Sequence, residues 1–232
     1  MTGSGAASIS AHRQVPTIEG MSDSTAGLIL AAGRATRFGS NKLFAVVGGR
    51  PMLQHVLDFA TAVGLKPVVV VVGPDHAAVE SELTWHGEQI VVNPNPERGL
   101  SSSVRLGMSA LAASTAERLL VLLGDQPFLA PDQAGRILSS PSDTARPISV
   151  PRYEGRPGNP VLLERSAWPL AESLTGDRGM VQVINAHPEL VRYVDVPGTN
   201  PDIDTAADLA ALTSGAGRGR SGHTAGEDRS RP

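Results

Sequence analysis

The sequence predicts a three-layer α/β domain whose central sheet is mostly parallel. Short apolar runs rich in Leu, Ile and Val recur along the chain, as expected of strands buried on both faces. They comprise residues 28–30, 68–72, 90–92 and 119–123. Segments with helical spacing lie between them, and this alternation implies right-handed βαβ units with helices on both faces of the sheet.

Composition limits the classes of protein to which the chain can belong. Its 232 residues are 41% hydrophobic and 19% charged, as is usual for one globular domain with a full core. The formal net charge of −3 argues against a sequence-independent nucleic-acid binder and against a membrane-surface protein. The chain has 0 cysteines, no bilayer-length apolar run and no secretory signal, so we expect a cytoplasmic protein.

The two ends of the chain differ from its middle. Residues 1–25 are rich in Ser, Ala, Gly and Thr, and residues 214–232 are rich in Gly and Arg. Because neither has a periodic apolar pattern, we expect two disordered tails around a single domain at residues 26–213. An upstream start, with the working protein beginning near Met21, and an arginine-rich arm for RNA are the alternatives.

The first strand ends in a loop suited to a polyanion. Small residues and two cations follow it, in the order Ala31, Ala32, Gly33, Arg37 and Lys42. Small residues let the backbone approach a bulky ligand, and backbone N–H groups with cationic side chains favour a triphosphate. The loop matches neither a Walker A motif nor a dinucleotide fingerprint. An ordinary turn with two solvated cations remains the alternative.

The helices are expected between the strands. Spacing is clearest in residues 52–63, where Leu53, Val56 and Leu57 share a face and Pro51 suits the first helical position. Residues 75–83, 102–111 and 131–138 are the other expected helices. In such folds ligands bind at the carboxyl ends of the strands, so the loops that follow strands are where functional residues are expected.

Two such loops carry polar motifs. After residues 90–92 come Gly99, the serines Ser101, Ser102 and Ser103, and Arg105, which is more than a helix cap requires. After residues 119–123 comes Asp125, a carboxylate at the end of a buried strand that is costly to leave unpaired. Mg²⁺ is the natural partner, because it takes one or two carboxylates and completes its shell with phosphate and water. A cap for residues 131–138 is the alternative for Asp125, which lies early for that role.

The second half of the chain is less regular. Residues 148–163 suggest a strand, a tight turn at Gly155-Arg156-Pro157-Gly158 and a second strand. Two helices are separated by Gly176-Asp177-Arg178-Gly179. A glycine C-cap followed by an Asp cap explains these residues as well as a role in ligand binding does. Near the end, Asp202, Asp204 and Asp208 surround Thr205, where Asp204 or Thr205 could cap a helix but the extra Asp202 is left over.

Together these segments resemble the motifs of the MobA-like nucleotidyltransferases, in the branch that includes molybdenum cofactor cytidylyltransferases. The matching stretches are Leu30-Ala31-Ala32-Gly33 with Arg37-Phe38-Gly39 and Lys42, residues 99–107, Gly124-Asp125-Gln126-Pro127, residues 151–162, Gly176-Asp177-Arg178-Gly179, and residues 202–209. Two positions depart from the family pattern: Ala35 replaces the usual Ser or Gly, and Asn159 replaces the His of many members.

The resemblance implies a Rossmann-like, GT-A-like nucleotidyltransferase fold and a role for each matching position. Nucleotide binding is implied for Leu30, Ala31, Ala32, Gly33, Arg37, Lys42, Gly99, Ser101, Ser102, Ser103 and Arg105. Arg37, Lys42 and Asp125 would be catalytic, and Asp125 would bind Mg²⁺ with Asp204, or with Asp202 as second choice. Acceptor binding is implied for Gly158, Asn159, Pro160, Gly176 and Asp177.

The expected activity is transfer of a nucleotidyl group from an NTP to a phosphorylated acceptor with release of pyrophosphate. The resemblance implies CTP and a molybdopterin-type acceptor, with a molybdoenzyme or its chaperone as a possible partner; Ala32, where guanylyl-transferring relatives usually have Gly, favours CTP. Three alternatives stay open. They are a guanylyltransferase or similar enzyme, an NAD(P)H-dependent oxidoreductase acting on nicotine blue, and a non-catalytic cofactor-insertion chaperone.

Overall fold

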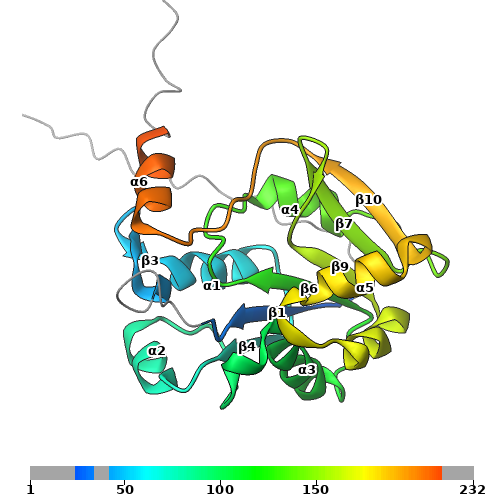
Figure 1. Cartoon of the computed structure of the whole chain (residues 1–232), viewed down its shortest axis with the longest axis horizontal. Helices are drawn as coiled ribbons and strands as arrows, with labels where there is room; N and C mark the ends of the chain where they lie inside the picture. Colours follow the sequence, from blue (N-terminus) through cyan, green and yellow to red (C-terminus); the bar gives the residue numbers. More distant parts are fainter. Residues whose placement is uncertain (1–23, 34–41, 216–232) are drawn as a thin grey trace, which may run out of the picture.

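The computed structural model, which describes residues 24–33 and 42–215, has the three layers that the sequence predicts (Figure 1). The central sheet has the strand order β10-β7-β9-β6-β1-β4-β5, and a short strand β8 pairs with β7. The bounds are β1 Thr25–Ala31, β4 Val68–Val72, β5 Gln89–Val92, β6 Arg118–Leu123, β7 Ile148–Tyr153, β8 Arg156–Pro157, β9 Val161–Glu164 and β10 Val191–Val196. The pairs β1–β4, β1–β6, β4–β5 and β7–β10 are parallel, whereas β9 runs antiparallel to both of its neighbours.

The strand ends agree with the sequence analysis within a few residues, but the predicted tight turn is wrong. Arg156 and Pro157 form β8 and pair with Tyr153 and Arg152, so the turn is made by Glu154 and Gly155, with φ of 50° and 80°. Two positive φ values in a row suit the twist of a two-residue hairpin. Pro157 is tolerated because β8 is a peripheral strand in which a missing N–H costs little.

The helices lie on both faces of the sheet because alternate strand residues point to opposite sides. Leu28 and Leu30 of β1 belong to one core cluster, and Ile29 and Ala31 belong to the other. The first cluster is covered by α3 (Leu100–Leu111), η3 (Arg165–Ser173) and α5 (Met180–Ala186), and the second by α1 (Met52–Ala62), α2 (His76–Glu82) and α4 (Pro131–Leu138). Figure 1 shows α1 and α4 on the side of the sheet opposite to α3 and α5.

The helix predictions are confirmed with small changes at the ends. The predicted stripe of α1 is buried, with Leu53 and Leu57 at 0% exposure and Val56 at 3%. Pro51 precedes α1 rather than opening it, since its ψ of 143° is extended and it pairs with Val46 in the hairpin of β2 (Val46–Val47) and β3 (Arg50–Pro51). The α3 helix begins two residues before the predicted start, at Leu100.

A third, smaller cluster fastens the end of the described chain to the body. Val47, Met52 and Ile203 are buried together, and Leu209 of α6 (Ala206–Gly215) packs against them. This cluster brings residues 201–205 to the carboxyl edge of the sheet, where the loops after β1, β5 and β6 also lie. Among the helices of the described ranges, none is long and apolar enough to cross a bilayer.

Candidate functional site

The centre of the site is a lysine held by two carboxylates. Lys42 Nζ lies 2.6 Å from Asp125 Oδ2 and 3.1 Å from Asp204 Oδ1. Lys42 begins the short helix η1 (Lys42–Phe44), Asp125 follows β6, and Asp204 precedes α6. Burial alone would lower the pKa of Lys42, but hydrogen bonds and charge from Asp125 and Asp204 outweigh it and raise the pKa above its ordinary value. The side chains of Lys42 and Asp125 are only 14% and 21% exposed, so this contact is poorly screened by solvent.

A glycine places Asp125 beside the end of β1. The Gly124 N–H donates to the carbonyl of Leu30 at 2.9 Å, which carries the loop after β6 across the neighbouring strand. A Cβ on Gly124 would lie 3.1 Å from Ala31 Cβ and 3.2 Å from the Leu30 oxygen, closer than most side-chain contacts. The small residue before Asp125 therefore allows the approach that sets the carboxylate next to Lys42.

The side chain of Asp204 can contact Lys42 because Thr205, and not Asp204, caps the helix that follows. Asp208 Oδ2 accepts hydrogen bonds from the Thr205 N–H and from Thr205 Oγ1, both at 2.8 Å, and Thr205 Oγ1 accepts from the Asp208 N–H. This reciprocal pair provides hydrogen-bond partners for backbone N–H groups at the start of α6. Of the two helix caps that the sequence allows, Asp204 and Thr205, the structure therefore has Thr205. Asp202 Oδ1 accepts from Gln126 Nε2 at 2.6 Å. Burial and the nearby negative charge of Asp125 raise the pKa of Asp202 above its ordinary value, so this carboxyl lies within electrostatic reach of the site.

The donors present fit a divalent cation that shares its shell with phosphate. Asp125 and Asp204 already bracket one cation, the Lys42 ammonium. Within the described part of the chain no group of three or more His, Cys, Asp or Glu residues could hold a metal ion. Two carboxylates with substrate phosphates and water are the usual donors of protein-bound Mg²⁺.

The end of β1 offers backbone rather than side chains to a ligand. Leu30, Ala31 and Ala32 are 7%, 3% and 5% exposed and belong to the two core clusters. Gly33 is exposed, and a Cβ built on it would meet nothing within 4 Å. Arg37, the other predicted cation of this loop, lies outside the described residues.

The predicted serines are organised by an asparagine that the sequence analysis did not single out. Asn93, 1% exposed at the end of β5, donates from Nδ2 to Ser102 Oγ at 2.8 Å and to Ser103 Oγ at 2.9 Å. The Ser102 hydroxyl donates to the Gly99 carbonyl. These two hydroxyls thus hold the loop, whereas Ser101 Oγ is buried and makes no hydrogen bond. An Asn at a strand end before a Ser-rich helix start was the available signal.

Arg105 points away from this loop. Its guanidinium donates to the Leu174 carbonyl, after η3. It also lines a groove of about 410 Å³ between α3 and η3, with Met108, Trp168 and Glu172 among the other walls. In this position the side chain ties α3 to η3.

The predicted acceptor residues fall into two places. The Asn159 carbonyl, between Gly158 and Pro160, accepts from Tyr153 Oη at 2.9 Å and from Asn200 Nδ2 at 3.0 Å. Burial raises the pKa of Tyr153 to about 12, so this hydroxyl stays a donor at neutral pH. Gly176 and Asp177, in η4 (Gly176–Arg178), lie instead against Gly99, where a Cβ would be 2.4 Å from the Gly176 carbonyl carbon and 2.6 Å from Asp177 Oδ1.

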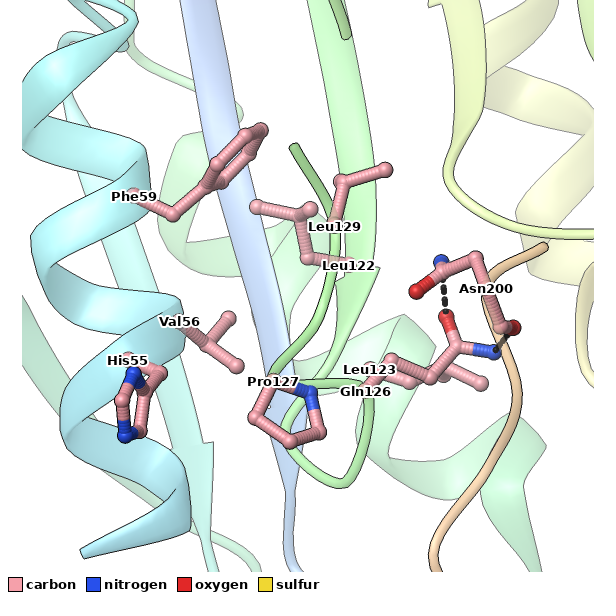
Figure 2. Close-up of a pocket in the computed structure, with 9 residues that line it drawn as sticks. All are labelled: His55, Val56, Phe59, Leu122, Leu123, Gln126, Pro127, Leu129 and Asn200. Atoms are coloured by element: carbon pink, nitrogen blue, oxygen red, sulfur yellow. Dashed lines mark hydrogen bonds between the residues drawn. The ribbon is translucent and has the colours of Figure 1, made fainter. Parts of the chain in front are cut away.

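Two amide side chains join the Asp125 loop to the Asn159 loop. Asn200 Nδ2 donates to Gln126 Oε1 at 3.0 Å as well as to Asn159. Figure 2 shows these two side chains facing each other on one wall of a small pocket, with His55, Val56 and Phe59 of α1 on the other wall. Neither amide was a predicted site residue, and both follow strands at the carboxyl edge.

Comparison with known proteins identifies the family. The MobA-like NTP transferase domain matches residues 27–191. The chain belongs to the MobA-like NTP transferase family. Nicotine blue oxidoreductase of Paenarthrobacter nicotinovorans is 30% identical over 196 residues, covering 80% of this chain and 95% of that protein. The 2-C-methyl-D-erythritol 4-phosphate cytidylyltransferase of Cereibacter sphaeroides is 33% identical over 145 residues, covering 59% of this chain and 64% of that enzyme.

Solved structures agree with this assignment. The crystal structure of Rv0371c from Mycobacterium tuberculosis H37Rv has a TM-score of 0.75 at 30% identity and covers 83% of this chain and 98% of its own. Its complex with manganese has a TM-score of 0.71 at 27% identity, with 82% and 98% covered. The expected family and Rossmann-like nucleotidyltransferase fold are therefore confirmed for this MobA-like protein.

Proposed function

We propose that this MobA-like protein transfers CMP from CTP to a phosphorylated acceptor of the molybdopterin type and releases pyrophosphate. The observation that carries the proposal is the placement of Lys42 between Asp125 and Asp204 at the carboxyl edge of the sheet. A site with two carboxylates and a cation beside exposed backbone at Gly33 suits a metal-bound triphosphate.

The chemistry asks the protein mainly for alignment and charge neutralisation. An oxygen of the acceptor phosphate forms a bond to the α-phosphorus of CTP, and the bond from that phosphorus to the bridging oxygen breaks to release pyrophosphate. Lys42 and Arg37 neutralise the triphosphate, and Asp125 and Asp204 would hold Mg²⁺, which supplies further charge neutralisation at the phosphates. No general base is required, because the acceptor phosphate is already ionised.

Several observations support the finer assignments. A cytidylyltransferase with a phosphorylated substrate in its name is among the relatives, and Ala32 stands where guanylyl-transferring relatives usually have Gly. The manganese complex of Rv0371c supports a divalent cation in this fold at 27% identity. The acceptor would lie by Asn159, which the Gln126–Asn200 pair connects to the Asp125 loop. A cytoplasmic molybdoenzyme or its chaperone would then receive the product.

A second candidate is an NAD(P)H-dependent oxidoreductase. The similarity to nicotine blue oxidoreductase, 30% over 80% of this chain, favours it. The two candidates differ in product: the transferase makes pyrophosphate from an NTP, and the reductase consumes NAD(P)H without it.

The test is a screen of the four common NTPs for pyrophosphate release, with Mg²⁺ and with molybdopterin present or absent. We expect pyrophosphate with CTP only when both Mg²⁺ and the acceptor are present. Parallel assays follow NADPH oxidation with nicotine blue. Oxidation without any NTP turnover would favour the reductase, GTP as the sole donor would favour a guanylyltransferase, and CTP binding without turnover would favour a chaperone.

A further inference from the structure

We infer that Gln126 is a positioning residue whose side-chain amide orients the segment from Asn200 to Asp204, so that Asp204 faces Asp125. The inference rests on the proposed function in one respect, the use of Asp125 and Asp204 to hold a divalent cation. Gln126 itself touches neither Lys42 nor Asp204 by any hydrogen bond in the described structure.

This one segment provides the hydrogen-bond partners of both the nitrogen and the oxygen of the Gln126 amide. The residue is 8% exposed, and its Nε2 donates to Asp202 Oδ1 at 2.6 Å and to the Asn200 carbonyl at 3.3 Å. Its Oε1 accepts from Asn200 Nδ2 at 3.0 Å. Figure 2 shows the face-to-face arrangement of Gln126 and Asn200. A buried amide loses its solvation, so these bonds are expensive to lose and they fix the partner segment.

The same segment is held on its other side by the core. Ile203 is 0% exposed in the third cluster, and its N–H donates to the Asp125 carbonyl at 3.1 Å. Asn200 and Asp202 are therefore fixed by Gln126, and Ile203 is fixed by the core and by Asp125 itself. Asp204 follows directly, and it is the carboxylate of this segment that pairs with Lys42, with its Oδ1 3.1 Å from Lys42 Nζ.

Asp202 acts in this arrangement as the anchor rather than as a ligand. Its Oδ1 accepts from the Gln126 amide, and Asp204 makes the hydrogen bond to the Lys42 ammonium group. Partners that orient a metal-binding carboxylate are worth about 10- to 100-fold in metal affinity in other sites. Loss of Gln126 should therefore weaken metal binding without removing any metal ligand.

The first test is titration with Mn²⁺ alone, followed by the electron paramagnetic resonance signal of the free ion. Gln126→Leu should raise the Kd for Mn²⁺ by about 10-fold. The matched control is Gln133→Leu, because Gln133 is equally buried at 7% exposure and its Nε2 donates to the Pro197 carbonyl at 2.9 Å in the stretch just before Asn200. Both variants lose a buried amide, but only Gln126 reaches Asp202, so the control should stay within about twofold of the parent.

A second pair of variants keeps the inference testable if Gln126→Leu fails to fold. Asp202→Asn and Asp202→Ala remove the same charge, but only the asparagine keeps an oxygen to accept from Gln126. Asp202→Asn should bind Mn²⁺ several-fold more tightly than Asp202→Ala. Equal affinities for this pair would contradict the anchor role, as would an unchanged Kd for a folded Gln126→Leu or an equal loss in Gln133→Leu.

The outcomes also separate this inference from the proposed function. A parent protein that binds Mn²⁺ and shows the predicted variant pattern, yet makes no pyrophosphate from any NTP, would overturn the proposed transfer and leave the role of Gln126 intact. If the parent protein releases pyrophosphate normally and Gln126→Leu does not change Mn²⁺ binding, the proposed transfer stands and the role of Gln126 is overturned. A parent that binds no Mn²⁺ would overturn the inference and the metal site together.

Discussion

The positive charge of Lys42 can pair either with the two carboxylates of the site or with a bound triphosphate. In the described structure its ammonium group forms ion pairs with both Asp125 and Asp204, so its one positive charge offsets only one of the two negative charges. A bound triphosphate offers more negative charge, and a divalent cation competes for the same two carboxylates. The residue can therefore fill the cation position until substrate arrives, which keeps two neighbouring carboxylates from standing unpaired.

Lys42→Met should separate these two roles. Without the ammonium group, Mn²⁺ should bind the nucleotide-free protein more tightly, because its competitor is gone. CTP should bind more weakly, and the loss should be larger at low salt, since a lysine meets phosphate as a screened point charge. Equilibrium titrations at two ionic strengths measure both.

The matched comparison is Gly33→Val. A Cβ at this position meets no protein atom within 4 Å, so the substitution should leave the fold undisturbed. It should weaken CTP binding by steric obstruction, and the loss of affinity should be the same at both ionic strengths. Parent-like CTP binding by both variants would remove the loop after β1 from the site.

Asp125→Asn should leave the fold intact and lose turnover. The substitution keeps the size of the side chain but removes the charge that balances Lys42 and would hold a metal. Loss of about 3 kcal/mol of transition-state stabilisation would lower the rate roughly 100-fold or more. Steady-state pyrophosphate release and a thermal melt of the same sample measure the two effects. A folded variant with near-normal Mg²⁺-dependent turnover would show that Asp125 is not a metal ligand.

At the scale of single residues, the sequence predicts identities better than contacts. Asp125 and Lys42 were expected in the site, because small residues, cations and carboxylates at strand ends have few structural uses. Their ion pair was not expected, since it spans 83 positions of the chain and no local pattern encodes it. Asn93, Gln126 and Asn200 were missed for a similar reason: a lone amide is common in loops, and only its buried partners reveal its role.

At the scale of elements, the start of α3 depends on close contact with η4. Gly99 has a φ of 89°, and a Cβ there would come within 2.4 to 2.6 Å of Gly176 and Asp177. Backbone atoms cannot move aside as a side-chain tip can, so the contact requires a residue without a Cβ. This contact joins the loop expected to bind nucleotide to the loop expected to bind acceptor.

Gly99→Ala should therefore destabilise the protein more than the unfavourable φ alone explains. The control is Gly87→Ala, which has a φ of 104° but meets nothing within 4 Å. The control should cost about 1 to 2 kcal/mol in the free energy of unfolding, as a strained alanine does. Gly99→Ala should cost at least 1 kcal/mol more, because η4 or α3 must shift. Urea denaturation measures the difference, and equal losses would show that the contact is loose.

The attachment of α1 to the loop before β5 should be sensitive to acid. Burial would raise the pKa of the Asp58 carboxyl, but hydrogen bonds from Gln54 and His86 and the charge of Arg50 outweigh it and lower the pKa. A pKa that is lower in the folded state contributes stability above the unfolded value of about 4, and this contribution is lost as the pH falls through the folded value. Urea midpoints between pH 5 and pH 3 should fall less for Asp58→Asn than for the parent. An identical pH dependence would mean that the carboxylate contributes nothing.

At the scale of the whole molecule, the layers follow from sequence pattern and the strand directions do so only in part. Residues 68–72 and 119–123 predict buried parallel strands, and β4 and β6 confirm them. Residues 90–92 also form a parallel strand, but the prediction that it is buried on both faces is wrong, because β5 lies at the edge of the sheet with exposed and half-buried residues. The antiparallel direction of β9 relative to β7 agrees with the strand, turn and strand predicted for residues 148–163. The antiparallel pairing of β9 with β6 was not predicted, because no local pattern shows which strand becomes its other neighbour. The position of residues 201–205 beside β6 likewise depends on the burial of Ile203, a long-range contact that local pattern does not show.

The most direct test of the account is the identity of the product that the whole protein makes. Purified protein, CTP, Mg²⁺ and molybdopterin should yield a cytidylylated acceptor, detected by mass spectrometry, with one pyrophosphate released for each adduct. Asp125→Asn protein should yield neither product at a comparable rate. If the parent protein forms no nucleotidyl adduct and no pyrophosphate with any NTP under these conditions, and instead oxidises NADPH in the presence of nicotine blue, the central claim is wrong.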